Sequence, residues 1–134
     1  ISQVDLFATL TQMIGIDVPK EAAPDSYDFT PVLKGLAYNS PLREATVHNT
    51  YNNIWGIRKG NWLYINESTG GHRKIPEYFK DMHAYVDFDT EGLLFNMLDD
   101  PEQKENLFEE NPMIVMNMSR LLKLYRNSGR SVER

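Results

Sequence analysis

Residues 54–66, IWGIRKGNWLYIN, decide the fold. Two short runs rich in aromatic and branched residues flank Lys59-Gly60-Asn61, a sequence typical of a β-hairpin turn. In the first run, Trp55 and Ile57 alternate with less apolar residues, so one side of the hairpin is apolar and the other can face water. The stretch therefore predicts two adjacent strands of an antiparallel sheet.

Other parts of the chain complete this sheet and cover it. Residues 45–49 and 93–97 are short and rich in branched and aromatic residues, which predicts two further strands. Asn111-Pro112 predicts the start of a helix with proline at its first position, and Gly129 is placed to end it. The apolar stripe of this helix consists of Ile114, Met118, Leu121, Leu122 and Tyr125. The sequence thus predicts an α+β fold, a small antiparallel sheet of about four strands packed by a C-terminal helix.

A further helix is predicted at the start of the chain. Ser2 and Asp5 have the spacing of a capping box, and Gly15 is placed to end the helix in a left-handed conformation. Its apolar stripe consists of Leu6, Phe7, Leu10, Met13 and Ile14. Because the chain starts at Ile1, not at a methionine, and the cap lies close to that end, we expect a piece of a longer protein whose missing part covers the stripe.

Two stretches are less regular. Residues 28–33 predict a short helix, with Asp28 as its cap and Gly35 as its stop. Residues 67–92 are mixed in character and contain Gly70-Gly71, and they give no prediction of secondary structure. Loops of this length inside a compact domain are usually functional or mobile.

The composition is that of an ordinary globular domain and excludes several classes of protein. The 134 residues include no cysteine, which excludes a disulfide scaffold, a thiolate zinc site and a cysteine nucleophile. Lys and Arg number 14 against 19 Asp and Glu, a net charge of −5, so we expect no nucleic-acid partner. No apolar stretch approaches the roughly 18 residues of a membrane span, and the first residues lack the pattern of an export signal.

Several short motifs occur in a recognisable order. They are Val4-Asp5-Leu6, Leu33-Lys34-Gly35, Pro41-Leu42-Arg43-Glu44, Val47-His48, the hairpin from Gly56 to Trp62, and Asp100-Pro101-Glu102 followed by Glu105-Asn106-Leu107. In this order they resemble the C-terminal end of formylglycine-dependent sulfatases of the arylsulfatase type. The resemblance covers about residues 1–124 apart from 67–92, and the hairpin paired with Asp-Pro-Glu-x-x-x-Asn-Leu is its most specific part.

The resemblance implies a longer parent that hydrolyses sulfate esters. Residues 1–38 would be the tail end of the parent's α/β core, and residues 39–134 its C-terminal subdomain of sheet and helix. The missing N-terminal catalytic core would be the partner of this chain, and a sulfated small molecule or glycan the substrate. Parents of this type are expected to be exported, to the periplasm, the cell exterior or the lysosome.

The chemistry that the resemblance implies for the parent uses calcium and a formylglycine made from the first residue of Cys/Ser-x-Pro-x-Arg. Residues 39–43 have this spacing, but Asn39 stands at the decisive position and has neither a thiol nor a hydroxyl to oxidise. We therefore assign no catalytic residue, metal site or cofactor to this chain and expect it to be inactive alone. His83 and the acidic residues between 99 and 110 lack the spacing of metal ligands.

Two places are candidates for substrate binding. His48, in a predicted strand, is either a hydrogen-bonded packing residue or points from the strand end toward the parent's active-site cleft, where the resemblance places a histidine in several relatives. His72, Arg73 and Lys74 form a cationic cluster beside two glycines, which is either a solvated loop or a contact for an anionic sulfated substrate.

A free-standing binding module is the alternative function. It would recognise a carbohydrate or a protein through Trp55, Trp62, Tyr64 and the basic loop. Such a module needs aromatic rings on its surface, whereas the hairpin pattern predicts that Trp62 lies at least partly against the helix.

Overall fold

The computed structural model describes residues 2–36, 41–49, 53–68, 76–84 and 86–132. The chain divides into two compact units, which are described separately: residues 1–44 with 123–134 form unit 1, and residues 45–122 form unit 2. Among the described residues, none of the helices is long and apolar enough to cross a bilayer.

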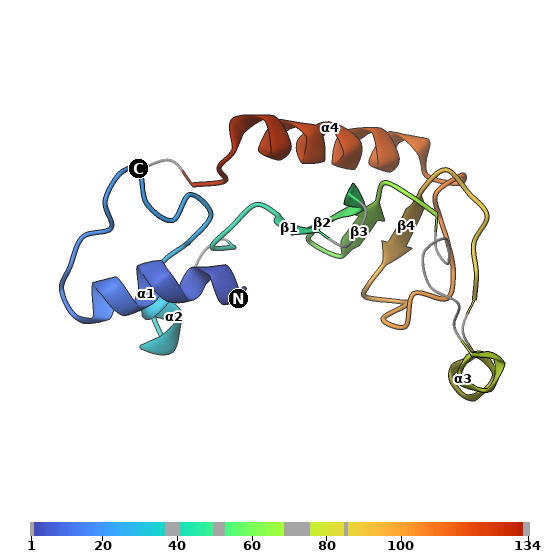
Figure 1. The fold of residues 1–134 in the computed structure, drawn as a ribbon, viewed down its shortest axis with the longest axis horizontal. Helices are drawn as coiled ribbons and strands as arrows, with labels where there is room; N and C mark the ends of the chain where they lie inside the picture. Colours follow the sequence, from blue (N-terminus) through green and yellow to red (C-terminus); the bar gives the residue numbers. More distant parts are fainter. Residues whose placement is uncertain (1, 37–40, 50–52, 69–75, 85, 133–134) are drawn as a thin grey trace. The chain divides into compact units, whose positions relative to one another are not determined.

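Unit 2 contains the sheet (Figure 1). Its strands are β1 (Thr46–Asn49), β2 (Trp55–Lys59), β3 (Trp62–Ile65) and β4 (Leu93–Asn96). They lie in the order β1-β2-β3-β4, and each neighbouring pair is antiparallel. Gly60 turns the hairpin between β2 and β3 with a φ of +58°, which a glycine adopts without steric cost. The four-stranded antiparallel sheet predicted from the sequence is confirmed.

Strand β4 carries the centre of the core of unit 2. Leu93, Leu94 and Phe95 are each at most 1% exposed, although consecutive strand residues point to opposite faces. Both faces of β4 are therefore covered. One of these faces carries Leu94 beside its cross-strand partner Tyr64, which pairs in turn with Ile57 of β2, and both partners are buried as well.

Helix α4 (Pro112–Ser128) contacts the sheet, which confirms the α+β fold (Figure 1). It begins at Pro112, as the Asn111-Pro112 pair predicted. The Asn111 carbonyl accepts hydrogen bonds from the amides of Ile114 and Val115 in its first turn. Its buried side chains are Met118 and Leu122, both members of the predicted apolar stripe. The helix is followed by Gly129 in the expected left-handed conformation, with a φ of +67°.

Helix α3 (Glu77–His83) lies within residues 67–92, for which no secondary structure was predicted. Its signals are Pro76 directly before it, an acidic residue in its first turn, and Lys80 and His83 in its last. None of its residues is buried, so it shows no apolar stripe of the kind that makes a longer helix recognisable.

Unit 1 contains the 3₁₀ turn η1 (Gln3–Asp5), α1 (Leu6–Met13) and the short α2 (Thr30–Leu33). The predicted capping box is present, and the Ser2 amide donates to Asp5 Oδ2 over 2.8 Å. Helix α2 begins two residues after Asp28, whose carboxylate accepts the Thr30 amide over 2.8 Å. Gly15 and Gly35 end the two helices at φ values of +75° and +69°.

Helix α1 buries its small and polar side in unit 1. Asp5, Ala8 and Thr9 are at most 3% exposed. The large apolar side chains of the predicted stripe are exposed, from 46% to 70%: Leu6, Phe7, Leu10, Met13 and Ile14. The expectation that this chain leaves the stripe poorly covered therefore agrees with the structure.

Candidate functional site

Of the two candidates for substrate binding, His48 lies within the described residues. His48 lies in β1, an edge strand, and its side chain is exposed. Its exposure is compatible with a contact to substrate, and the choice between packing and substrate binding in the parent stays a prediction. The cluster His72, Arg73 and Lys74 lies outside the described residues, so its position relative to His48 stays a prediction.

The register of β1 and β2 places a second basic residue on the same face as His48. His48 pairs with Gly56, and Thr46 pairs with Arg58, so all four residues point to one face of the sheet. Gly56 carries no side chain to cover the imidazole, and Arg58 is exposed. The Arg58 Nε donates a long bond of 3.4 Å to the carbonyl of Gly60. We call the exposed surface of Thr46, His48 and Arg58 the β1–β2 face.

The β1–β2 face can bind an anion or a sugar hydroxyl. A guanidinium donates paired hydrogen bonds to sulfate-like oxygens, and an imidazole donates or accepts one. No role was predicted for Arg58 from the sequence. The alternation of the hairpin indicated that Arg58 can face water, but only the pairing of β1 with β2 shows that Arg58 lies on the same face as His48.

The aromatic residues required by the alternative binding module are mostly covered. Tyr64 is buried and stacks on Phe108, with 6.4 Å between ring centroids. Trp55 and Trp62 are half-buried. This part of the sheet does not present a row of free aromatic rings.

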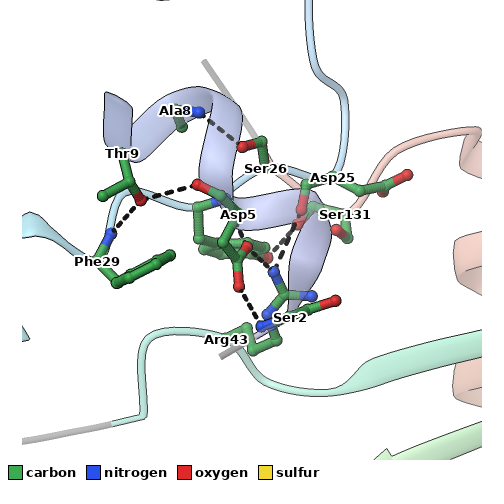
Figure 2. A network of polar contacts seen from close by, with 10 residues as sticks. Ser2, Asp5, Ala8, Thr9, Asp25, Ser26, Phe29, Arg43 and Ser131 are labelled. Carbon is green, nitrogen blue, oxygen red and sulfur yellow. Dashed lines mark hydrogen bonds and ion pairs between the residues drawn. The ribbon is translucent and has the colours of Figure 1, made fainter. Parts of the chain in front are cut away.

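Two of the motifs meet in a buried polar network of unit 1 (Figure 2). Asp5 Oδ1 accepts the amide of Tyr27 over 3.0 Å and forms an ion pair with the guanidinium of Arg43. Arg43 also donates to the carbonyl of Asp25 over 3.3 Å and lies over the Tyr27 ring. Arg43 is the arginine of residues 39–43, the stretch with the spacing of Cys/Ser-x-Pro-x-Arg. Its contacts show that it stabilises unit 1.

The Asp-Pro-Glu-x-x-x-Asn-Leu motif fixes the loop that follows β4. The Asp100 carboxylate accepts the Glu105 amide over 2.9 Å, and the backbone amides of this turn lower the pKa of Asp100. The Asn106 Oδ1 accepts the amides of Leu94 (2.9 Å) and Phe108 (3.1 Å). Its Nδ2 donates to Thr90 Oγ1 over 3.0 Å. Through the hydrogen bond between Asn106 and Leu94, the motif therefore holds the loop against β4.

The resemblance implies calcium and a formylglycine for the parent, and the described residues of this chain do not fit either group. Within the described ranges, no group of three or more His, Asp or Glu side chains can hold a metal ion. Asn39 and Ser40 lie outside those ranges, and the sequence offers no oxidisable residue at position 39.

The chain is similar to sulfatases. It is 35% identical over 121 residues to an N-acetylgalactosamine-6-O-sulfatase of Bacteroides thetaiotaomicron, an alignment that covers 90% of this chain and 22% of that relative. No model of a known protein family matches the chain.

Solved structures agree with this similarity. A Bacteroides thetaiotaomicron protein, studied for the metabolism of multiple glycosaminoglycans, superposes with a TM-score of 0.69 and 30% identity over 95% of this chain and 25% of its own. A putative sulfatase from the same organism gives a TM-score of 0.63 at 22% identity, again over 95% of this chain and 25% of its own, which shows the fold alone. The chain thus spans about a quarter of the length of the relatives it matches.

Proposed function

Because this chain belongs to the sulfatase family as a segment of about a quarter of its relatives' length, we propose that it is the C-terminal segment of an enzyme that hydrolyses carbohydrate sulfate esters. The observation that carries the proposal is the 35% identity to an N-acetylgalactosamine-6-O-sulfatase along nine-tenths of the chain. In the reaction, water cleaves the ester and releases the sugar alcohol and inorganic sulfate.

The rest of the parent holds the reacting groups in this proposal. Calcium and formylglycine find neither ligands nor a precursor among the described residues of this chain. Attack on sulfur needs an activated nucleophile and stabilisation of the developing charge. The isolated chain is therefore inactive.

Unit 1 supplies the surface on which the parent's catalytic core packs. Soluble proteins rarely leave a large contiguous apolar patch in water, and such a patch marks an interface. Helix α2 also exposes large apolar side chains, since Val32 is 41% and Leu33 57% exposed. The occupant is the remaining part of the sulfatase chain, which makes up about three-quarters of the length of the relatives. Residues 1–38 then form the end of the core.

The β1–β2 face forms part of the substrate rim. The sulfate group is common to every sulfatase substrate, so specificity depends on groups that meet the sugar. His48 and Arg58 are exposed on one face of an edge strand pair and can donate to sugar hydroxyls or to a further sulfate. His72, Arg73 and Lys74 would add positive charge to this rim.

The experiment measures sulfate release by the full-length parent from N-acetylgalactosamine 6-sulfate, using ion chromatography. His48→Ala lowers kcat/KM by roughly 10- to 150-fold, the effect of losing a hydrogen bond to a charged group, and leaves Tm unchanged. Asn49→Ala is the matched control, because Asn49 is the next exposed residue of β1 and points to the opposite face.

Two results would contradict the proposal. A lower Tm of His48→Ala with an unchanged kcat/KM would make His48 a packing residue. Sulfate release by the purified isolated chain would show that the chain carries its own catalytic machinery.

A further inference from the structure

Unit 2 contains a cavity of about 720 Å³ beside the sheet. Its walls are Ile65, Leu93 and Phe95 of the sheet on one side and six further residues on the other: Phe79, Met82, His83, Ala84, Val86 and Phe88. We call it the α3 cavity. Its volume lies within the roughly 300–1,000 Å³ that small-molecule sites occupy.

Aromatic residues belong to both walls of the cavity, but Phe95 of the sheet is only 1% exposed, so a ligand would meet mainly the rings of the other wall. The rings of Phe79 and His83 on α3 lie 4.4 Å apart between centroids, and those of Phe88 and Phe95 lie 5.9 Å apart. Phe79 is exposed to 43% although it is a large apolar side chain, so the described chain leaves part of this aromatic wall in water.

A fixed polar edge completes the cavity. Glu102, Gln103 and Lys104 line it, and all three are exposed. Lys104 forms an ion pair with Glu102, so a ligand would meet a paired carboxylate and ammonium beside the Gln103 amide, which both donates and accepts. The side chains of Asp100 and Asn106 hold the loop that carries them. Gln103 adopts a φ of +58°, which a residue with a side chain rarely adopts, and such strained residues cluster at ligand sites.

The cavity and the β1–β2 face lie on the same face of the sheet. Cross-strand pairing joins His48 to Gly56, Gly56 to Ile65, and Ile65 to Leu93, one row of residues that runs from β1 to β4. Three strand spacings separate the ends of this row, a distance of about 14 Å. A ligand that contacts His48 and also enters the cavity must extend across this row.

We propose that the α3 cavity is a subsite for a sugar ring of an oligosaccharide substrate whose other end lies at the β1–β2 face. A pyranose ring has an apolar face of C–H groups that suits an aromatic wall, and hydroxyls around its edge that need both donors and acceptors. The inference rests on the proposed function, since it extends the substrate of that enzyme from one sugar to several.

The test compares two substrates of the full-length parent, N-acetylgalactosamine 6-sulfate and a tetrasaccharide that carries the same sulfated sugar at its end. Phe79→Ala raises KM for the tetrasaccharide about three- to tenfold, as expected for the loss of one aromatic contact, and leaves kcat unchanged. Both constants for the monosaccharide stay unchanged. Tyr78→Ala is the matched control, because Tyr78 is a neighbouring aromatic residue of α3 that is 68% exposed and does not line the cavity.

A second variant removes doubt about folding. Gln103→Gly deletes the polar side chain where glycine suits the left-handed backbone, so it raises KM for the tetrasaccharide without lowering Tm. Ala23→Gly, at another left-handed position that does not line the cavity, is its control. Equal effects on both substrates, or no effect on either, would overturn the subsite.

Failure of the proposed function gives a different result. In that case the wild-type parent releases sulfate from neither substrate. Binding of the unsulfated tetrasaccharide, measured by saturation-transfer NMR, then tests the cavity without activity. Weaker binding by Phe79→Ala and Gln103→Gly than by their controls supports the subsite, and absent or equal binding overturns it.

Discussion

The buried Asp5 and the half-buried Arg43 form an ion pair although 38 residues separate them in the sequence. Each belongs to one of the short motifs that resemble sulfatases, and no local pattern linked the two. The pair joins the start of α1 to the segment that precedes β1 (Figure 2). These motifs thus contribute to the architecture of unit 1.

Replacing Arg43 should destabilise unit 1 strongly. Arg43→Met leaves the Asp5 carboxylate buried without its counter-charge, which costs about 3 kcal/mol of unfolding free energy. Urea unfolding of the chain followed by circular dichroism measures the loss. Arg120→Met, an exposed arginine of α4, is the control and should change stability by no more than about 0.5 kcal/mol. Adding Asp5→Asn to Arg43→Met should recover part of the loss, and a further drop in stability would contradict this account.

Gly92 should tolerate no side chain. A Cβ atom there would lie 2.6 Å from the Phe108 ring and 3.0 Å from the Ile65 carbonyl oxygen. Gly92→Ala therefore forces these groups apart and destabilises the chain by about 1–3 kcal/mol. Gly56→Ala is the control, because its new methyl group would find its nearest neighbours at 3.6 Å, an ordinary contact. Equal midpoints of urea unfolding for the two variants would show that Phe108 moves aside freely.

Local patterns predicted the regular elements well. The alternation in residues 54–58 and the turn at Gly60 were sufficient for the hairpin, and Asn111-Pro112 for the start of α4. Helix α3 was missed because it is short and buries no side chain, so it has no apolar periodicity. The sequence also predicted the exposed stripe of α1. It did not predict that Asp5, on the buried side, forms an ion pair with Arg43.

The candidate site was predicted only in part, because a site depends on pairs of distant residues. His48 was identified by type and position, whereas its neighbour Arg58 emerges only from the register of β1 on β2. The α3 cavity depends on how the segment that contains α3, Val86 and Phe88 packs against β3 and β4. Nothing in the local sequence of that segment specifies this packing. The role of His72, Arg73 and Lys74 stays a prediction.

The titration of Tyr125 gives stability a dependence on alkaline pH. Partial burial and the nearby Glu44 carboxylate, which accepts the Tyr125 hydroxyl over 3.2 Å, raise the pKa of Tyr125 from 10.0 to about 12. A raised folded-state pKa means that the folded chain keeps this proton while the unfolded chain loses it. The stabilisation is complete below pH 10 and is lost as the pH rises from 10 to about 12.

Ring-labelled tyrosine followed by ¹³C NMR measures the pKa of Tyr125 directly. Glu44→Gln removes the carboxylate charge and should lower that pKa, which stays above 10 because the burial remains. Glu109→Gln, an exposed glutamate of unit 2, should leave the titration unchanged. An unchanged titration in Glu44→Gln would show that Glu44 has no influence on the phenol.

The exposed stripe of α1 gives the sharpest test of the docking proposed for unit 1. Leu10 is 56% exposed, so Leu10→Glu in the isolated chain should change the unfolding free energy by no more than about 0.5 kcal/mol and increase solubility. In the full-length parent the same carboxylate would be buried against the catalytic core without a partner, which is strongly unfavourable. We therefore expect a marked loss of soluble parent and a lower Tm. Gln12→Glu adds the same charge to an exposed polar position of α1 and should be tolerated in both proteins. A parent that accepts Leu10→Glu as readily as Gln12→Glu would show that the core does not cover this stripe.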